Sequence, residues 1–230
     1  MATKKDSTTV IDLPEIKLRT ATLKIIGDTP LICHAWSKKA KLEMMSKHLK
    51  KAAQAKEARR PHVEFADSLY WLTEKPNLDD LDDDEARQIL AEVIPQSKFG
   101  FPALAFKAAA LTAGFQQGAL ARNAGTGTLA RTTARGAFRV IGNEFAVIEG
   151  LPTPREDIVR IGGATSKVPQ VCYRAEFKSW STELDIQYSA NVITIEQIAN
   201  LFMLGGLAIG VGDWRPEKNG TFGTFHIAHN

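Results

Sequence analysis

The sequence predicts an α+β fold with a ferredoxin-like core, in which an antiparallel sheet carries two helices on one face. Alternating apolar and polar residues over 16–26 indicate a first strand. Two helical patterns follow, one beginning at Pro102 and one capped by Thr194. Further alternating segments lie between and after them. Without one insertion, the order reads β-α-β-β-α-β, which is the ferredoxin-like arrangement.

The first hundred residues contain that insertion. Residues 1–14 are polar, and we expect a flexible N-terminus followed by a single domain over 15–230. A helical insertion is predicted over about 34–98. Its first half, 37–60, reads as a helix with nine basic against two acidic residues. Because a basic helix is often only a solvated face, a binding role and a solvated role both stay open.

The second half of the insertion is acidic. Residues 77–85 hold six carboxylates, but they lack the glycine and the terminal glutamate that an EF-hand calcium loop needs. We therefore predict a solvated acidic loop that leads into a helix near 85–91. Such a loop would repel nucleic acid and mark a face that does not bind it.

The remaining elements follow from turn residues and apolar patterns. The helix from Pro102 is rich in alanine, which favours close packing on the sheet. After it we expect, in order, a flexible basic loop over 123–136, a strand over 138–149 with a bend at 142–143, a long connection over 150–168, one or two strands over 171–189, the helix from Thr194, a glycine-rich loop and a last strand over 221–228.

Composition excludes several classes. The hydrophobic share of 44% and the charged share of 24% are ordinary for a soluble globular protein. No run of 18 apolar residues occurs and the N-terminus has no secretory pattern, so a cytoplasmic protein without membrane contact is expected. Cys33 and Cys172 lack metal-ligand spacing, which predicts reduced thiols. We expect no metal and no cofactor.

The glycine-rich loop is the most informative segment. Six glycines fall between Gly205 and Gly223, a density typical of positive φ or of close approach to the backbone. Gly205 and Gly206 read equally well as a helix cap. The loop is neither a Walker A loop nor a dinucleotide fingerprint. Bare N–H groups beside cations and a tryptophan suit a phosphate-and-base ligand, and the candidate residues are Gly210, Gly212, Trp214, Arg215 and Lys218.

Basic residues outside this loop extend the candidate surface. Between Lys107 and Arg139 the chain carries five basic residues and no acidic one. Such a segment suits contact with a phosphate backbone. The further candidates for nucleic-acid binding are Lys38, Lys39, Lys41, Lys107, Arg122, Arg131, Arg135, Arg155, Arg160 and Lys167.

Three pieces of the chain resemble the RAMP superfamily, in particular the repeated backbone subunit of CRISPR effector complexes. They are the opening strand ending in Gly-Asp-Thr-Pro-Leu, the segment Phe99-Gly-Phe-Pro-Ala-Leu-Ala-Phe-Lys-Ala-Ala-Ala-Leu111, and the C-terminal helix with its glycine loop and last strand. The resemblance covers about half the chain and lies in architecture and short patterns.

The resemblance implies single-stranded RNA or DNA bound along a helical row of copies, with other effector-complex subunits as further partners. Lys107, Arg215 and the backbone of 210–223 would hold phosphates, and a thumb-like loop over 150–168 would fold over a neighbour's strand. The sequence Gly-Asp-Trp-Arg-Pro departs from the usual loop, so a relative outside CRISPR systems, for example in a bacteriophage, is also indicated.

Three functions follow from these observations. The first is non-catalytic binding of single-stranded nucleic acid, and the second is a bacteriophage structural or assembly role that uses the same surfaces for protein contacts. The third is a nuclease, for which Asp157 is a weak candidate because some RAMP relatives cut RNA with an aspartate in such a loop. Asp157 fits a local ion pair equally well. His34, Asp213, His226 and His229 form no recognisable acid–base pair in the sequence, so no catalytic residue is expected.

Overall fold

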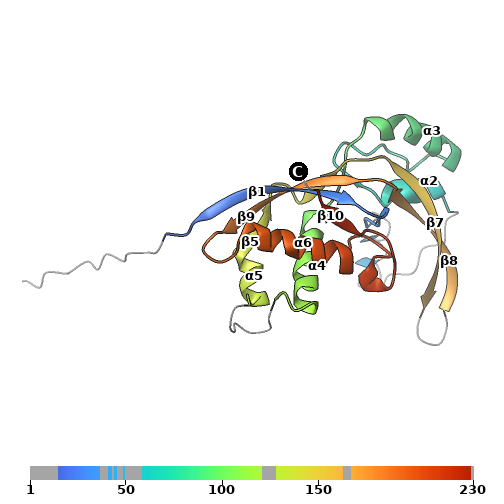
Figure 1. The fold of residues 1–230 in the computed structure, drawn as a ribbon. Helices are drawn as coiled ribbons and strands as arrows, with labels where there is room; N and C mark the ends of the chain where they lie inside the picture. Colours follow the sequence, from blue (N-terminus) through green and yellow to red (C-terminus); the bar gives the residue numbers. More distant parts are fainter. Residues whose placement is uncertain are drawn as a thin grey trace, which may run out of the picture.

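The computed structural model describes residues 15–36, 41–42, 44–45, 49, 59–120, 128–162 and 167–228, except the side chains of 160–162 and 167. The fold is α+β, with antiparallel sheets and helices packed against them (Figure 1). Within these ranges, no helix has the length and apolar character that a membrane span requires.

The central element is a four-stranded antiparallel sheet. Its strands are β1 (Leu18–Gly27), β5 (Phe138–Ile141), β9 (Ser181–Ser189) and β10 (Phe225–Ile227), in the order β10-β1-β9-β5. Residue 25 pairs with residue 227, and residue 22 pairs with residue 185. The prediction that the first and last strands share one sheet is therefore confirmed.

Two helices cover one face of this sheet. They are α4 (Ala103–Gln116) and α6 (Ile195–Ala208), which lie side by side below the sheet in Figure 1. Thr194 caps α6 in a reciprocal box with Gln197, as its sequence predicts. The strands of this sheet and the two helices follow one another along the chain in the order β1-α4-β5-β9-α6-β10, with the other helices and strands inserted between them.

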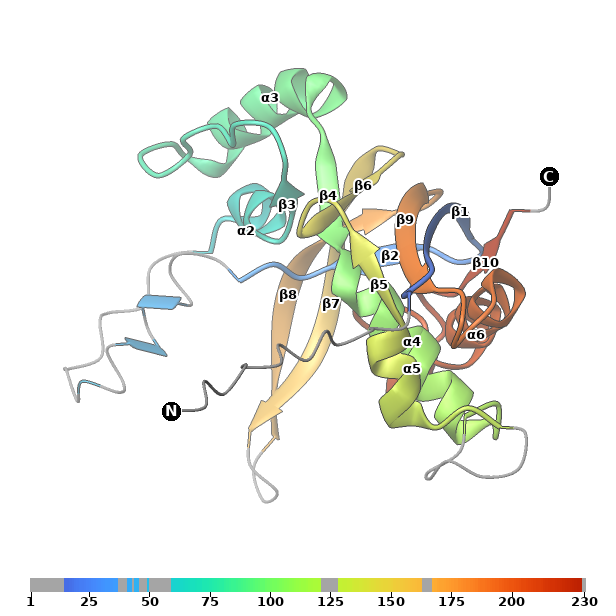
Figure 2. The ribbon, with the colours of Figure 1, turned by 90° about the vertical axis from the view of Figure 1, so that its left-hand side faces the viewer.

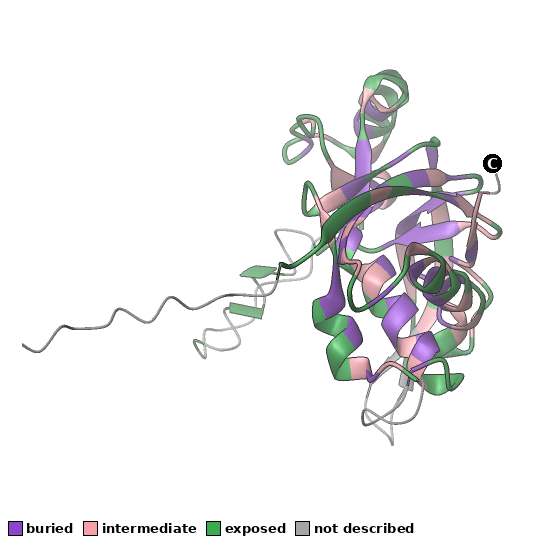
Figure 3. Cartoon of the chain, turned by 60° about the vertical axis from the view of Figure 1, so that its left-hand side comes forward, coloured by how far each residue is buried: buried purple, intermediate pink, exposed green. Residues whose placement is uncertain are grey.

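The core lies between the helices and the sheet (Figure 3). Phe106 of α4 is fully buried, and its ring lies 5.5 Å from the ring of Phe225 in β10. The two helices approach closely at Gly205, where an added Cβ would lie 2.7 Å from the Ala110 nitrogen. Of the two roles that the sequence left open for Gly205, the structure therefore supports close approach to the backbone, because the residue lies within α6.

The described part of the insertion contains two helices and a short strand. It holds α2 (Pro61–Asp67), β3 (Tyr70–Trp71) and α3 (Asp83–Val93). A 3₁₀ turn over Ile94–Gln96 leads into β4 (Phe99–Pro102). The acidic run ends as predicted in a helix, which Asp82 and Glu85 open with a capping box. The predicted basic helix over 37–60 lies mostly outside the described residues.

The connection over 150–168 is not a loop. It contains β7 (Pro152–Gly162), which pairs along its full length with β8 (Lys167–Phe177), while β2 (Leu31–Cys33) pairs on the other side of β8. The long hairpin curves away from the central sheet in Figure 2. Pro152 and Pro154 are tolerated in β7 because this strand lies at the edge of the sheet β2-β8-β7.

Two further predictions differ from the structure. The segment expected as a flexible loop over 123–136 contains α5 (Arg131–Ala137), which buries Ala134 and Ala137. The expected strand over 138–149 is two strands, because Gly142 has a φ of +101° and turns the chain out of the central sheet. β6 (Phe145–Ile148) then joins β3 and β4 in a separate sheet.

Candidate nucleic-acid interface

The glycine loop over 209–224 folds tightly on itself and on β2. Gly210, Gly212 and Gly223 have φ values of +68°, +80° and +67°. The Val211 N–H donates to the Gly223 carbonyl at 2.9 Å, and the Asp213 N–H donates to the Ile32 carbonyl at 3.1 Å. These positions need glycine because other L-residues rarely adopt such angles.

A pocket of about 400 Å³ lies between this loop and α4. Small side chains on α4 form one wall, and the backbone of 209–212 forms the opposite wall. Phe101 and Pro102 of β4 add apolar surface. The polar residues of the lining are His34, Tyr70, Thr112, Asp213, Arg215 and Glu217. The two segments that the sequence singled out, the alanine-rich helix and the glycine loop, therefore form one cavity.

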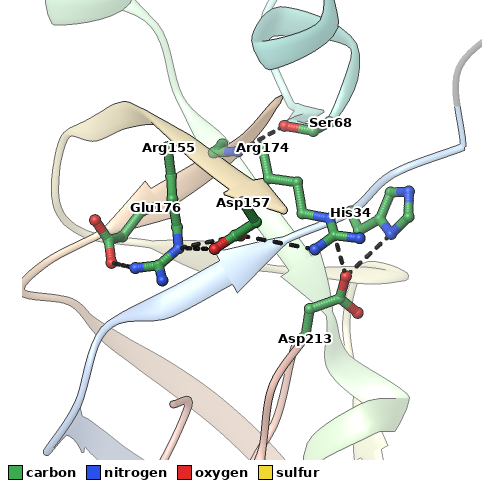
Figure 4. Close-up of polar contacts among 8 residues, drawn as sticks. His34, Ser68, Arg155, Asp157, Arg174, Glu176 and Asp213 are labelled. Atoms are coloured by element: carbon green, nitrogen blue, oxygen red, sulfur yellow. Dashed lines mark hydrogen bonds and ion pairs between the residues drawn. The ribbon is translucent and has the colours of Figure 1, made fainter. Parts of the chain in front are cut away.

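A chain of ion pairs connects the hairpin to the glycine loop (Figure 4). Asp213 Oδ2 lies 3.0 Å from His34 Nδ1 and 3.3 Å from Arg174 Nε. Arg174 Nη1 lies 3.7 Å from Asp157 Oδ2. Arg155 completes the chain by donating to Asp157 at 2.9 Å. Arg174 is only 9% exposed, so these carboxylates are needed to offset the cost of burying its positive charge.

The carboxylate of Asp157 thus takes part in two ion pairs, with Arg155 and Arg174. This is the ion-pair alternative that the sequence left open for it, with Arg174 as a partner from β8 that sequence reasoning missed. Arg155 also donates to Glu176 at 2.8 Å, and its guanidinium lies 4.6 Å from the centre of the Phe222 ring.

Burial and charge set the protonation states in the pocket. Burial alone would raise the pKa of Asp213, but the hydrogen bond with His34 and the positive charge of Arg174 lower it overall. Asp213 is therefore a carboxylate at neutral pH. Burial raises the pKa of Tyr70, so this side chain is a neutral phenol. Burial also raises the pKa of the Cys33 thiol, which stays protonated.

The charges around the glycine loop are balanced. Glu217 accepts from Arg215 Nε and Nη2 at 3.0 and 2.6 Å, and Arg215 Nη1 donates to the Gly212 carbonyl at 3.0 Å. In this chain of contacts, three guanidinium groups face four carboxylates. The charge of Arg215, which the sequence indicated as a phosphate contact, is thus paired within the loop.

Trp214 lies on the outside of this loop. Trp214 is 41% exposed and has a φ of +55°. The alternative in which Trp214 fills the core under the loop is therefore wrong. An exposed indole on a rigid turn can stack on a base or contact a neighbouring protein.

A second candidate surface lies where α4 packs against α5 and the start of β5. Lys107 Nζ donates to the carbonyls of Arg135 and Phe138 at 2.9 and 2.6 Å, and burial lowers its pKa. The Arg131 guanidinium lies 5.0 Å from the centre of the Phe115 ring. No acidic residue occurs anywhere over 99–143. We call Lys107, Arg131 and Arg135 the α5 patch.

Lys107 differs from its predicted role. Two of its three donors are used by backbone carbonyls, so it fixes α4 to the junction of α5 and β5. Its charge is not neutralised by these carbonyls and still contributes to the α5 patch.

The other predicted residues are dispersed. Lys41 and Lys218 are exposed, and Lys218 ends a 3₁₀ turn over Pro216–Lys218 in the glycine loop. Lys38, Lys39 and Arg122 lie outside the described residues, as do the side chains of Arg160 and Lys167.

Sequence reasoning missed Tyr70, Arg174 and Glu217, and it missed the pairing of His34 with Asp213. The residues of this pair are 179 positions apart, and β2 brings His34 to the loop. No local pattern distinguishes these side chains. Among the described residues, no group of three or more His, Cys, Asp or Glu side chains is arranged to hold a metal ion.

The Asp213 contacts give a prediction about stability. Asp213→Asn should lower the free energy of unfolding by about 1–3 kcal/mol at neutral pH, because the buried Arg174 loses the nearer of its two carboxylate partners. Since folding lowers the pKa of Asp213, its contribution is complete above the unfolded pKa of about 3.9 and is lost as pH falls through the lower folded value.

Denaturant unfolding of both proteins from neutral pH to about pH 2 measures this difference. The exposed Asp185→Asn variant is the control, with an expected effect within about 0.5 kcal/mol. A gap between wild type and Asp213→Asn that stays constant across the acid range would contradict a lowered pKa.

Comparisons with known proteins were made with the whole chain. No protein-family profile matches it, and no curated protein matches it. Among solved structures, it is similar to Cmr6 from Pyrococcus furiosus, with 11% identity, 92% of this chain and 98% of that chain covered, and a TM-score of 0.36. At this TM-score the two chains superpose only loosely, so the roles proposed below rest on the residues of this chain.

Proposed function

We propose that this protein binds single-stranded nucleic acid without cleaving it, as a RAMP-like subunit with a ferredoxin-like core that assembles into a helical row of copies. The observation that carries the proposal is the α5 patch. It consists of two arginines on α5 and of Lys107, which bonds the end of α5, and the stretch over 99–143 that carries them has no carboxylate. Such uncompensated positive charge is what a phosphate backbone requires.

The two candidate surfaces have different tasks in this proposal. The α5 patch contacts phosphates, because its cations are not neutralised by the segment that carries them. The glycine loop contacts bases, because its charges are paired and its indole is exposed. Helix α4 connects the two, since its first turns line the pocket and Lys107 bonds the end of α5.

The open face of the central sheet does not support a binding mode of the RRM type. That mode stacks bases on aromatic residues of the sheet. Opposite the helices, the described strands instead present polar and aliphatic side chains, among them Thr20, Thr22, Lys24, Glu183, Asp185, Gln187 and Arg139. Contacts at the edges of the fold, through α5 and the glycine loop, are favoured.

The proposal is tested by purifying the full chain at low salt and measuring the ratio of absorbance at 260 and 280 nm. A raised ratio that falls after ribonuclease or deoxyribonuclease treatment supports it and identifies the nucleic acid. A protein-like ratio that neither nuclease changes, with no binding of added single strands, would reject it.

Removing the α5 patch should weaken binding to all sequences alike. For Arg131→Ala with Arg135→Ala, the slope of log affinity against log salt should become shallower by about 1.4, because each phosphate of a single strand that a cation neutralises adds about 0.7 to the slope. Fluorescence anisotropy over a salt series measures this slope. Lys24→Ala, on the open sheet face, is the matched control and should leave it unchanged; equal slopes for all three proteins would argue against the patch.

A second candidate function is a structural or assembly protein, such as one from a bacteriophage. It is favoured by the far half of the hairpin, where Ile158 and Val168 are 69% and 64% exposed. Exposed apolar side chains on a protruding hairpin suit contact with another protein. Assembly that occurs without nucleic acid and does not change with salt would favour this function.

A further inference from the structure

We infer that the pocket between the glycine loop and α4 binds one unstacked nucleobase and selects guanine. The inference rests on the proposed function and adds the ligand that the pocket takes. The cavity of about 400 Å³ is near the lower end of small-molecule sites and suits a ligand of nucleoside size.

The walls of the pocket suit a flat ring. Ala105, Ala108 and Thr112 project short side chains from α4, and Gly210 and Gly212 contribute backbone without a side chain. Gly212 is fixed in this role, because an added Cβ would lie 2.6 Å from the Ile32 carbonyl oxygen. A planar base can therefore approach both the helix and the loop backbone closely.

Tyr70 supplies an aromatic surface at the same pocket. Its ring is held by two neighbours, an edge contact with Phe101 at 5.7 Å between ring centres and a tilted contact with Phe145 at 5.3 Å. A fixed aromatic ring at the mouth of a pocket favours stacking with a base.

The hydrogen-bonding groups specify the edge of the base. Asp213 uses Oδ2 for both His34 and Arg174, and Glu217 uses Oε2 for both nitrogens of Arg215. Among the described residues, Oδ1 of Asp213 and Oε1 of Glu217 accept no hydrogen bond. The pocket therefore offers two carboxylate oxygens as acceptors, while each nitrogen of Arg215 already donates one hydrogen bond.

Guanine matches these acceptors better than the other bases. Its Watson–Crick edge carries two adjacent donors, the ring N1–H and the 2-amino group, which the remaining oxygens of Asp213 and Glu217 can accept, one from each carboxylate. Adenine, cytosine and uracil each place an acceptor beside their donor, and that acceptor would face a carboxylate oxygen. A buried mismatch of this kind leaves polar groups unpaired and is the usual source of discrimination.

The test uses fluorescently labelled oligouridylate of about 15 nucleotides, within the usual span of single-strand sites, with one central substitution. The central base is guanine, adenine, cytosine, hypoxanthine or 7-deazaguanine, in both ribose and deoxyribose backbones. We expect guanine and 7-deazaguanine to bind about 5- to 150-fold tighter than uracil, adenine or cytosine. Hypoxanthine, which lacks the 2-amino group, should lose most of that gain.

Three variants locate the effect. Glu217→Gln and Ala108→Leu, which alters an exposed wall residue, should each reduce the preference for guanine while affinity for oligouridylate persists. Asp213→Asn should also reduce the preference for guanine. If that variant does not fold, Glu217→Gln and Ala108→Leu alone test whether the pocket selects guanine. Asp185→Asn, on the open sheet face, should keep the full preference.

The outcomes separate the two proposals. Equal affinity for all central bases in the wild type would overturn guanine selection and leave nucleic-acid binding intact. A guanine preference that Glu217→Gln and Ala108→Leu do not change would overturn the assignment to this pocket. No binding of any oligonucleotide would overturn both proposals.

Discussion

Replacing Gly223 by alanine should destabilise the protein by about 2–4 kcal/mol, because the new Cβ would be both strained and obstructed. The residue has a φ of +67°, in the left-handed region that disfavours other L-residues. An ideal Cβ would also lie 1.7 Å from the Val211 carbonyl oxygen. Since the Val211 N–H donates to the Gly223 carbonyl, the whole glycine loop must shift to accept the substitution.

Chemical denaturation measures this loss, and Gly136→Ala is the matched control. Gly136 lies in α5 with no atom within 4 Å of an added Cβ. Alanine at a helical site of this kind should stabilise the protein by about 0.5–1 kcal/mol. If Gly223→Ala unfolds at the same denaturant concentration as wild type, the tight folding of the loop is contradicted.

Replacing Trp214 by alanine should weaken nucleic-acid binding by about 1–3 kcal/mol, which is about 5- to 150-fold in affinity. The expected loss arises from base stacking on an exposed indole. Because the residue is 41% exposed, the melting temperature should stay close to that of wild type. Anisotropy titration and thermal unfolding of the same preparation measure both quantities.

Two further variants show whether the effect is specific. Trp214→Phe keeps an aromatic surface and should retain most of the affinity. Trp71→Ala should instead lower stability, because that indole donates to the Ala66 carbonyl at 2.8 Å and packs against Phe99. A Trp214→Ala protein that melts much lower and binds normally when folded would show that this residue serves the fold.

Elements with local signals were predictable from the sequence. Thr194 and Gln197 form the capping box that opens α6, and Pro102 immediately precedes the first residue of α4. Both signals act within one helical turn, so they do not depend on the rest of the fold. The bend at Gly142 was predicted for the same reason, although its consequence, a change of sheet, was not.

Elements that depend on distant pairing were not predictable. β7 contains Pro152 and Pro154, which indicate a loop when read alone. Its strand conformation comes from pairing with β8, and its edge position tolerates the prolines. α5 lacks any capping signal, and the burial of Ala134 and Ala137 against the rest of the molecule accounts for its helix.

The candidate site also has a part that was predictable from the sequence and a part that was not. The glycine loop was predictable because glycine density is a property of one segment. The partners that neutralise its charges were not, because Arg174 comes from β8 and His34 follows β2. The sequence therefore indicated Arg215 as a phosphate contact, whereas Glu217, two residues away, pairs with it in the folded loop.

The most direct test of the central claim is titration of a labelled single strand of about 15 nucleotides with the wild-type protein, from about 50 mM to about 200 mM salt. With three cations in the α5 patch, we predict saturable binding and a slope of log affinity against log salt of about −2. Absence of saturable binding at about 50 mM salt, or an affinity that does not change across the series, would contradict the claim that this protein holds a nucleic-acid backbone.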